Sequence, residues 1–174
     1  MTGKATIMTN FYYYGGTNNE DGYGGASTDY FYTYGGIDEF DDYYGSGATD
    51  YAYFYGSSSL TFVAGSLGTL NYRYGGYSTA LDFWNIEVIY AGSGDDLFYG
   101  DSNSNNFTGN GGSDSAYGGS GFDYLYGSAG NDTLAAGADG GNMYGGDDGD
   151  TMYFYSGYNN ENAYGGTGND SFRT

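Results

Sequence analysis

The chain contains no cysteine, no proline and no histidine. Without cysteine it can form no disulfide, no zinc–thiolate site and no thiol nucleophile. Without histidine it lacks the commonest general base of enzymes and a common ligand of transition metals. Long apolar runs are also missing, including the length needed to cross a membrane and the core of a conventional signal peptide near the N-terminus. We therefore expect no membrane insertion and no conventional secretion signal.

Basic residues are scarce as well. There are 3 Lys and Arg residues against 22 Asp and Glu residues, which gives a formal net charge of −19 at pH 7. Such a charge repels nucleic acids and anionic membranes, so we expect neither as a partner. It also opposes compaction unless cations bind to the carboxylates. Paired acids such as Asp95 and Asp96 follow a sequence period, which explains them better than a glycosidase site does, and we predict no enzymatic activity.

Glycine and tyrosine are abundant, with 36 and 25 copies in 174 residues. Many of them belong to a nine-residue unit that recurs almost without a break from Ala91 to Arg173. Aspartate at position six and an apolar residue at position eight mark the best-preserved units. The resulting pattern GGxGxDxUx, in which U is apolar, is the calcium-binding repeat of parallel β-helices. A single match would be weak, whereas several tandem copies at a fixed spacing are a specific signal.

The chemistry of the unit explains its composition. Glycines in positions one to six supply the positive φ angles of a tight turn. Positions seven to nine form a short strand in which position eight points inward. One such strand buries little, so units must stack, two per coil, into a flattened spiral of parallel strands. The aspartate places a carboxylate beside the carbonyl oxygens of the turn, and these are the hard oxygen ligands that Ca²⁺ prefers.

These repeats resemble the RTX (repeats-in-toxin) family, closely over residues 91–173 and more loosely over residues 11–76. The resemblance implies a β-roll that holds a row of Ca²⁺ ions between successive turns. It also implies an extracellular or cell-surface location, reached by a non-classical export route similar to type I secretion.

We predict an all-β fold, a parallel β-roll or β-solenoid with two short strands per coil of about 18–21 residues and about eight coils. Residues 1–10 lack the repeat and would form an N-terminal extension or cap. Residues 11–76 would form tyrosine-rich irregular coils, residues 77–90 an excursion and re-entry strand, and residues 91–174 the regular β-roll. Residues 11–174 would then be one continuous solenoid.

An excursion over residues 77–90 would bring the two halves into phase, so that every lengthened strand, such as the one at 72–74, lies in one sheet. One edge would then carry most of the position-six aspartates. Its predicted calcium ligands are Asp29, Asp50, Asp96, Asp114, Asp132, Asp150 and Asp170. On the irregular opposite edge we expect Asp123 and, as a weaker ligand, Asn105. Roughly five to eight Ca²⁺ ions would bind in total, although solvated acidic turns are an alternative.

Position nine faces outward, and tyrosine dominates it in both sheets. One predicted column contains Tyr12, Tyr32, Tyr53, Tyr99, Tyr117 and Tyr153, and the other contains Tyr23, Tyr44, Tyr90, Tyr126, Tyr144 and Tyr164. The lengthened strands would add a further outward rank that includes Tyr14, Tyr34 and Tyr55. Stacked at about 4.8 Å per coil, these rings would form aromatic ladders. The ladders could serve association or ligand binding, or they could only stabilise the sheets.

The leading hypothesis is a secreted Ca²⁺-binding structural protein. It would associate with copies of itself, as a homo-oligomer or homo-polymer, through the tyrosine ladders or the open ends, and contribute to an extracellular matrix, a filament or a surface layer. A second hypothesis is a Ca²⁺-rigidified module that binds polysaccharide or ice. A third is an export or folding domain of a larger RTX-like protein. Without calcium, the Gly-, Tyr-, Ser- and Asn-rich composition favours a disordered chain.

Overall fold

The structure, a computed structural model, describes residues 88–155 and 160–174 without interruption. Before residue 88 it describes residue 28 and the strands 12–14, 21–23, 30–33, 39–41, 51–54, 61–63, 71–74 and 77–80. Within these residues all regular secondary structure is β-strand, and most strands lie parallel in two sheets. The predicted all-β parallel solenoid is confirmed. The described part of the chain has no helix with the length and hydropathy needed to span a membrane.

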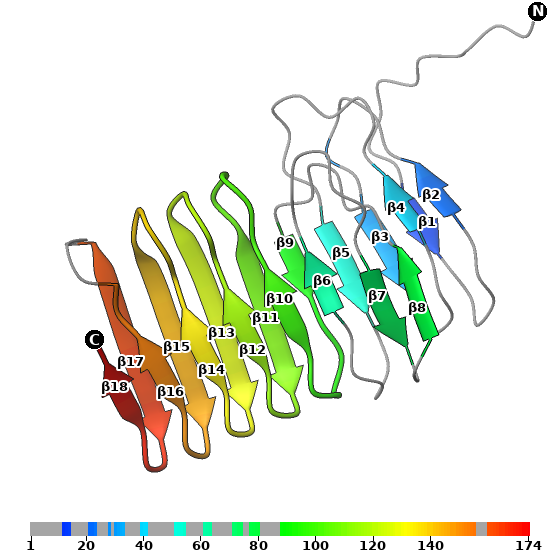
Figure 1. The fold of residues 1–174 in the computed structure, drawn as a ribbon. Coiled ribbons are helices and arrows are strands. Elements are labelled where there is room, and N and C mark those ends of the chain that lie inside the picture. Colours follow the sequence, from blue (N-terminus) through cyan, green and yellow to red (C-terminus); the bar gives the residue numbers. More distant parts are fainter. Residues whose placement is uncertain are drawn as a thin grey trace, which may run out of the picture.

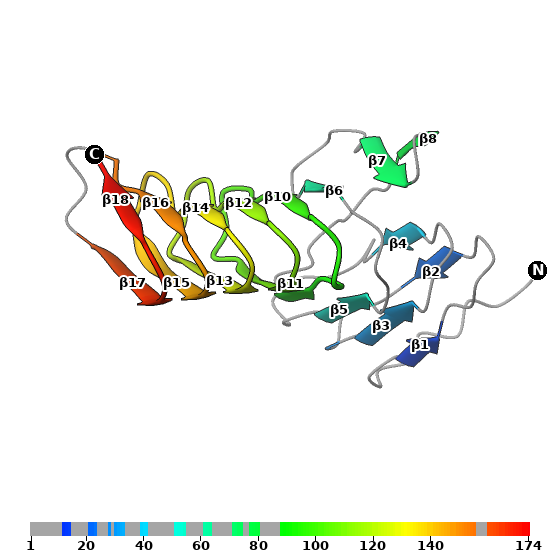
Figure 2. The same ribbon diagram turned by 90° about the horizontal axis from the view of Figure 1, so that it is seen from below.

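The two sheets face each other in the coiled part of the molecule (Figure 1 and Figure 2). The first is 8-stranded, with the order β1-β3-β5-β9-β11-β13-β15-β17. Its strands are β1 (Tyr12–Tyr14), β3 (Tyr30–Thr33), β5 (Tyr51–Phe54), β9 (Val88–Tyr90), β11 (Asn106–Gly111), β13 (Asp123–Ala129), β15 (Gly141–Asp147) and β17 (Glu161–Thr167). The second is 6-stranded and contains β6 (Thr61–Val63), β10 (Leu97–Tyr99), β12 (Ser115–Tyr117), β14 (Thr133–Ala135), β16 (Thr151–Tyr153) and β18 (Ser171–Arg173).

From β9 onward the chain alternates between the sheets, with one strand in each sheet per coil. Phe107 pairs with Leu125 and Ala116 pairs with Leu134, so equivalent positions in these coils are 18 residues apart. Between Asp150 and Asp170 the separation is 20 residues. Because single strands this short bury little surface, each coil is stabilised mainly by its two neighbours.

The core lies between the two sheets. It contains Phe98, Ala116, Leu134 and Met152 from the second sheet and Ile89, Phe107, Leu125 and Met143 from the first, all of them buried. The predicted inward direction of position eight is thus confirmed in these coils, whereas Phe172 in the last coil is 54% exposed. Phe98 and Phe107 stack across the core with ring centroids 4.9 Å apart. Burying one large apolar side chain contributes about 1.5–3 kcal/mol, so each added coil stabilises the roll by a small step.

The strands before residue 88 are arranged differently from the prediction. β5 pairs with β9, so that Ala52 lies opposite Ile89, and β3 continues the same sheet with Phe31 opposite Ala52. The predicted column joined Phe31 and Ala52 to Phe98 of the second sheet, and this is wrong. Phe62 of β6 lies opposite Phe98 instead.

The cause is an antiparallel hairpin formed by β7 (Asn71–Tyr74) and β8 (Tyr77–Ala80), in which Tyr74 lies opposite Tyr77. The prediction that residues 72–74 extend a strand of the roll is therefore wrong. Two glycines separate β7 from β8 in the sequence, and Gly-Gly is a common two-residue hairpin connection. Taking this strand out of the roll changes the number of half-coils before β9 by one, so β1, β3, β5 and β6 lie in the sheet opposite to the predicted one.

The number of coils is also lower than predicted. β2 (Asp21–Tyr23) and β4 (Glu39–Asp41) form a separate parallel pair, and β6 alone of the described early strands joins the second sheet. The solenoid therefore has about 5 turns rather than about eight. The predicted extension over residues 1–10, and residues 81–87 of the predicted excursion, lie outside the described residues.

The early tyrosines belong to other columns than predicted, for the same reason. Tyr90 stacks on Tyr53, and Tyr53 stacks on Tyr32, with ring centroids 4.7 and 4.8 Å apart. Tyr32 and Tyr53 therefore continue the column of the first sheet. The prediction that Tyr23 does so is wrong, because β2 pairs with β4 outside that sheet, and Tyr44 lies outside the described residues. Tyr14 was predicted to lie in a second outward rank, separate from the column of Tyr32. This is wrong, because Tyr14 lies opposite Tyr32 in the pairing of β1 with β3 and so belongs to the same column. Tyr34 and Tyr55 lie outside the described residues.

Candidate metal centre

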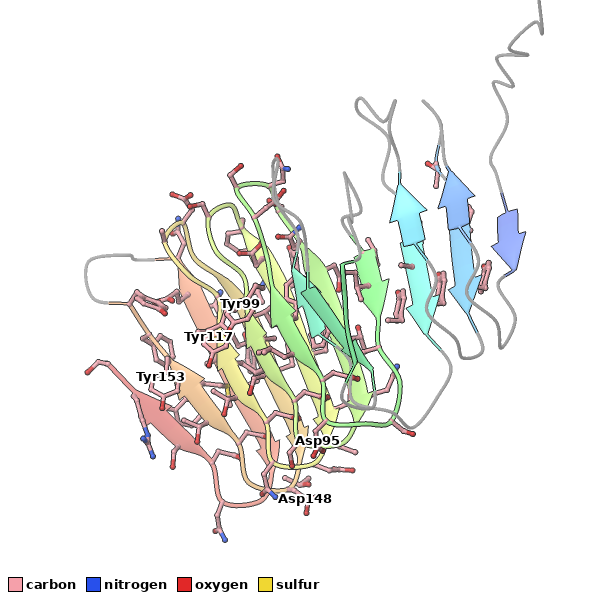
Figure 3. All side chains as sticks on the ribbon, turned by 45° about the vertical axis from the view of Figure 1, so that its right-hand side comes forward. Asp95, Tyr99, Tyr117, Asp148 and Tyr153 are labelled. Carbon is pink, nitrogen blue, oxygen red and sulfur yellow. The ribbon has the colours of Figure 1, made fainter. Side chains whose placement is uncertain are left out.

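A column of aspartates runs along one edge of the roll, in the turns that lead from the first sheet to the second. Figure 3 labels Asp95 and Asp148, which lie in turns of this edge. The column itself contains Asp96, Asp114, Asp132, Asp150 and Asp170, all predicted to share an edge. The backbone N–H of each of the first four donates to Oδ1 of the aspartate in the next coil, at N···O distances of 2.7, 2.7, 2.9 and 3.1 Å along the column. One carboxylate oxygen therefore joins neighbouring coils.

The other oxygen, Oδ2, has no hydrogen-bond partner in Asp114, Asp132 and Asp150, although it is buried in each. An unpaired buried carboxylate costs several kcal/mol. Burial accordingly raises the pKa of Asp114 to about 6 and that of Asp132 to about 7, and it also raises the pKa of Asp150. A cation at these oxygens would offset the cost of burying their charge.

Backbone oxygens lie near these carboxylates because position one of the turn usually carries no side chain. A Cβ added at Gly109 would overlap Oδ2 of Asp114 and would lie 2.9 Å from the carbonyl oxygen of Gly127 in the next coil. The same relation recurs at Gly145, whereas Ala91 occupies position one of the first turn. The missing Cβ leaves a small space between a carboxylate oxygen and a carbonyl oxygen of the neighbouring coil.

Positions two and four have left-handed backbone conformations in the four turns of this edge that begin at Gly109, Gly127, Gly145 and Gly165. Asn110 and Ser128 occupy position two with φ angles of 71° and 88°, which polar residues tolerate in turns. Gly130, at position four, has a φ angle of 123°, and a Cβ there would overlap the carbonyl oxygen of Gly112. The turn is therefore built around glycine at this position by both conformation and crowding.

The opposite edge reproduces the arrangement at Asp123. This residue is fully buried, Oδ1 accepts a hydrogen bond from the backbone N–H of Asn105 at 2.8 Å, and Oδ2 has no hydrogen-bond partner. Burial raises the pKa of Asp123 to about 7. A Cβ at Gly118 would overlap Oδ2 of Asp123 and the carbonyl oxygen of Ala136. Oδ1 of Asn105 already accepts a hydrogen bond from the backbone N–H of Asp101 at 3.1 Å, which fits the weaker role predicted for this amide.

The column of this edge ends after Asp123. Gly141 stands opposite it in the next coil and has no carboxylate, so the backbone N–H of Asp123 donates to the carbonyl oxygen of Gly140 at 3.3 Å. Asp29 and Asp50 lie outside the described residues. The strands that follow them, β3 and β5, belong to the first sheet, whereas the strands after the aspartates of the regular column belong to the second. The prediction that all seven aspartates share one edge is therefore wrong.

The donor set of the column fits Ca²⁺. In the part of the chain that the structure describes, no three acidic side chains gather at one point. A cation would therefore take about one carboxylate per turn and complete its shell with backbone carbonyl oxygens. Ca²⁺ accepts such shells of about 6–8 oxygens in flexible geometry, whereas structural Zn²⁺ sites use the thiolate and imidazole ligands that this sequence lacks.

The raised pKa values predict a pH dependence of the metal-free roll. In the folded state the pKa is about 6 for Asp114 and about 7 for Asp123 and Asp132, against an ordinary value of 3.8. A group whose pKa is raised by folding stabilises the fold fully below the unfolded pKa, and this contribution is lost as pH rises through the folded pKa. In chelator, we expect circular dichroism to show more β structure at about pH 5, where these carboxyl groups can be protonated in the folded state, than at about pH 7.5, where the chain is expected to be a coil. More β structure at the upper pH would contradict this assignment.

Three segments of the sequence, residues 88–107, 108–143 and 155–174, match the family described as RTX calcium-binding nonapeptide repeat (4 copies). The matched segments contain Asp96, Asn105, Asp114, Asp123, Asp132 and Asp170, whereas Asp150 lies between two of them. No curated protein matches the chain. The repeat that the sequence spacing indicated, and most of the turns that bury carboxylate oxygens without hydrogen-bond partners, thus lie within segments that match one known calcium-binding unit.

Proposed function

We propose, from the premise that this chain is an RTX calcium-binding β-roll protein, that it is a secreted structural protein whose roll folds around Ca²⁺ and then associates with other copies. The observation that supports the calcium part best is the set of buried carboxylate oxygens without hydrogen-bond partners in Asp114, Asp123, Asp132 and Asp150. Asp96 and Asp170 extend the proposed ligand set along the same hydrogen-bonded column. Ca²⁺ would supply the positive charge that this strongly acidic chain lacks.

An extracellular location fits the chemistry of such sites. RTX repeats occur in secreted proteins exported by type I systems. Calcium sites of extracellular modules have dissociation constants of about 10⁻⁴–10⁻³ M. Sites of this strength would stay empty in the calcium-poor cytosol and fill outside the cell, so the acidic chain would be exported unfolded and would fold after release. The proposed role is structural rather than enzymatic.

The outer face of the first sheet supplies the proposed contact surface. Tyr126 stacks on Tyr144 with ring centroids 4.7 Å apart and planes 5° from parallel, and Tyr144 stacks on Tyr164 at 5.1 Å and 7°. We call these three rings the first-sheet ladder. Tyr164 is 56% exposed. Because the ring faces are covered by one another, the ladder presents ring edges and hydroxyl groups, a surface suited to packing against a similar ladder rather than to stacking on sugar rings.

The second sheet carries a similar row. Tyr99 stacks on Tyr117 at 5.2 Å, and Figure 3 shows Tyr153 on the same outer face. Tyr99 is 42% exposed and Tyr153 is 36% exposed. Both faces of the roll therefore present aromatic rows, and monomeric proteins rarely expose large apolar patches without an interaction to serve. This arrangement supports association along both faces.

Association through the first-sheet ladder can be tested by replacing Tyr126, Tyr144 and Tyr164 with serine together. We expect calcium-dependent folding to be retained, because these side chains point away from the core. We also expect this variant to lack the large species that analytical ultracentrifugation should show for the original chain in calcium. Asn106, Asn142 and Asn162 face outward in the neighbouring column of the same sheet, so their triple replacement by serine is the matched control. Unchanged association of the tyrosine variant would locate the contact elsewhere.

A further inference from the structure

The first-sheet ladder holds three phenol rings in a regular, nearly parallel stack. Tyr126, Tyr144 and Tyr164 occupy the same register position in adjacent parallel strands. Their planes are 5° and 7° from parallel, and their centroids are 4.7 and 5.1 Å apart. Since neighbouring rings leave the backbone in the same direction, each ring carbon lies beside its equivalent in the next ring. The carbons ortho to the hydroxyl groups are therefore adjacent along the ladder.

Tyr32, Tyr53 and Tyr90 of the same sheet are stacked in the same way, whereas Tyr124 lacks this arrangement. Tyr124 lies on the same strand as Tyr126 and is 39% exposed. Its register neighbours are Asn106 and Asn142, and its ring contacts Phe122 edge-on at 5.6 Å. Tyr124 is therefore exposed but not stacked on another tyrosine, whereas Tyr126 of the same strand is stacked, so the two residues can be compared directly.

The composition leaves tyrosine as the residue available for covalent cross-links between coils. The chain has no cysteine, and Lys4 is its one lysine, so neither disulfides nor a network of lysine-derived links can form. Tyrosine, with 25 copies, is the one abundant side chain that undergoes oxidative coupling.

We propose that the first-sheet ladder is a site of oxidative tyrosine coupling, in which a peroxidase and hydrogen peroxide link adjacent coils through dityrosine. Two phenols each lose one electron and one proton to the oxidant, and one hydrogen peroxide is reduced to two water molecules. The two phenoxyl radicals join through a carbon–carbon bond between ortho carbons. The hydrogens on those carbons then move to the oxygens and restore both phenols, so the pair loses two hydrogen atoms in total. Tyr99 and Tyr117 of the second sheet, and Tyr32, Tyr53 and Tyr90 of the first, are stacked in the same way.

Folding brings the partners together and so controls the reaction. Tyr126 and Tyr144 are 18 residues apart in the sequence and meet through the parallel pairing of β13 and β15. In an unfolded chain every tyrosine competes for each radical, whereas in the roll the register neighbour is held at the coil spacing. The proposal requires the folded roll but not the self-association proposed above. Its links would lock neighbouring coils together even after calcium is withdrawn.

The test treats the dilute protein with a haem peroxidase and hydrogen peroxide, in calcium and in chelator. We expect dityrosine fluorescence in calcium, and an intrachain link between Tyr126 and Tyr144 that is about tenfold more abundant than in chelator. A protease that cleaves before aspartate separates all three ladder tyrosines into different peptides, so mass spectrometry can assign each link. Tyr144→Phe keeps the ring but should abolish both links of the first-sheet ladder while retaining the one between Tyr99 and Tyr117. Tyr124→Phe is the matched control and should change nothing.

Three results would overturn the proposal. Coupling of the more exposed Tyr124 as often as Tyr126 would show that accessibility rather than stacking decides the reaction. Equal linkage in calcium and chelator, while circular dichroism reports folding in calcium alone, would show that the ladder has no part in it. Links exclusively between chains would assign the chemistry to the contact between copies. If circular dichroism shows no calcium-dependent folding, the proposed function fails, and the coupling proposal is then decided by whether Tyr126 and Tyr144 are still the preferred pair.

Discussion

Chelation of calcium is expected to unfold the roll formed by residues 88–174. The folded state buries carboxylate oxygens without hydrogen-bond partners in both edges, and bound Ca²⁺ would neutralise their charge at neutral pH. At a free calcium concentration ten times the dissociation constant, one site stabilises the fold by about 1.4 kcal/mol. Four such sites would add about 6 kcal/mol, which is comparable to the whole stability of a typical domain, about 5–15 kcal/mol. We expect a coil-like far-ultraviolet circular dichroism spectrum in chelator and a β spectrum in millimolar calcium.

Salt must be controlled in this measurement, because screening alone reduces repulsion among so many acidic groups. Sodium chloride at matched ionic strength should restore little β structure, and Mg²⁺ should restore less than Ca²⁺ because it demands a near-octahedral shell and dehydrates reluctantly. A β spectrum of equal intensity in chelator and in calcium would contradict the assignment of these turns as calcium sites.

Gly130→Ala is expected to lower the free energy of unfolding in calcium by about 3 kcal/mol or more. Gly130 has a φ angle of 123°, which alanine rarely adopts. The added Cβ would also overlap the carbonyl oxygen of Gly112 and lie 2.7 Å from its carbonyl carbon. These are backbone atoms of the neighbouring coil, so the clash can be relieved only by separating the two coils. Denaturant unfolding at fixed calcium, followed by circular dichroism, measures the loss.

Gly111→Ala is the matched control. Gly111 lies in the preceding turn, has no left-handed φ angle, and an added Cβ would approach Ser93 no closer than 3.8 Å. The residue opposite it in the next coil is already an alanine, Ala129. We expect a change below about 0.5 kcal/mol. Equal losses in the two variants would show that the turns do not have the conformation described.

The regular half of the fold was predictable because one period sets the strands, the turns and the inward positions together. Phe98, Leu134 and Met152 are buried at position eight, as the repeat predicts. The irregular half was not predictable by the same means. The alternation of outward and inward side chains in residues 71–80 is compatible both with a strand of the roll and with a hairpin. The sequence period alone does not distinguish these two structures. Gly75 and Gly76 carried the signal for a hairpin, and a single half-coil misassigned there places β1, β3, β5 and β6 in the wrong sheet.

The sequence predicted which residues form the candidate site, but not the role of each carboxylate oxygen. Spacing placed Asp114 and Asp132 in one column, and the structure joins them by a backbone hydrogen bond of 2.7 Å. Spacing does not show that Oδ1 is used between coils while Oδ2 stays buried without a partner, because that division depends on the register of the coils. The role of Gly109 was missed for a similar reason. A Cβ added at Gly109 would occupy the space beside Asp114, and this proximity is apparent in the folded structure but not in the sequence.

The most direct test of the calcium assignment is equilibrium dialysis with radioactive calcium, performed on the same samples whose folding is followed by circular dichroism. The account predicts that several Ca²⁺ ions bind to each chain and that their binding and the gain of β structure share one midpoint. It also predicts that both are lost together when chelator is added. A chain that reaches its full β content before any calcium is bound would contradict the claim that Ca²⁺ holds the coils together.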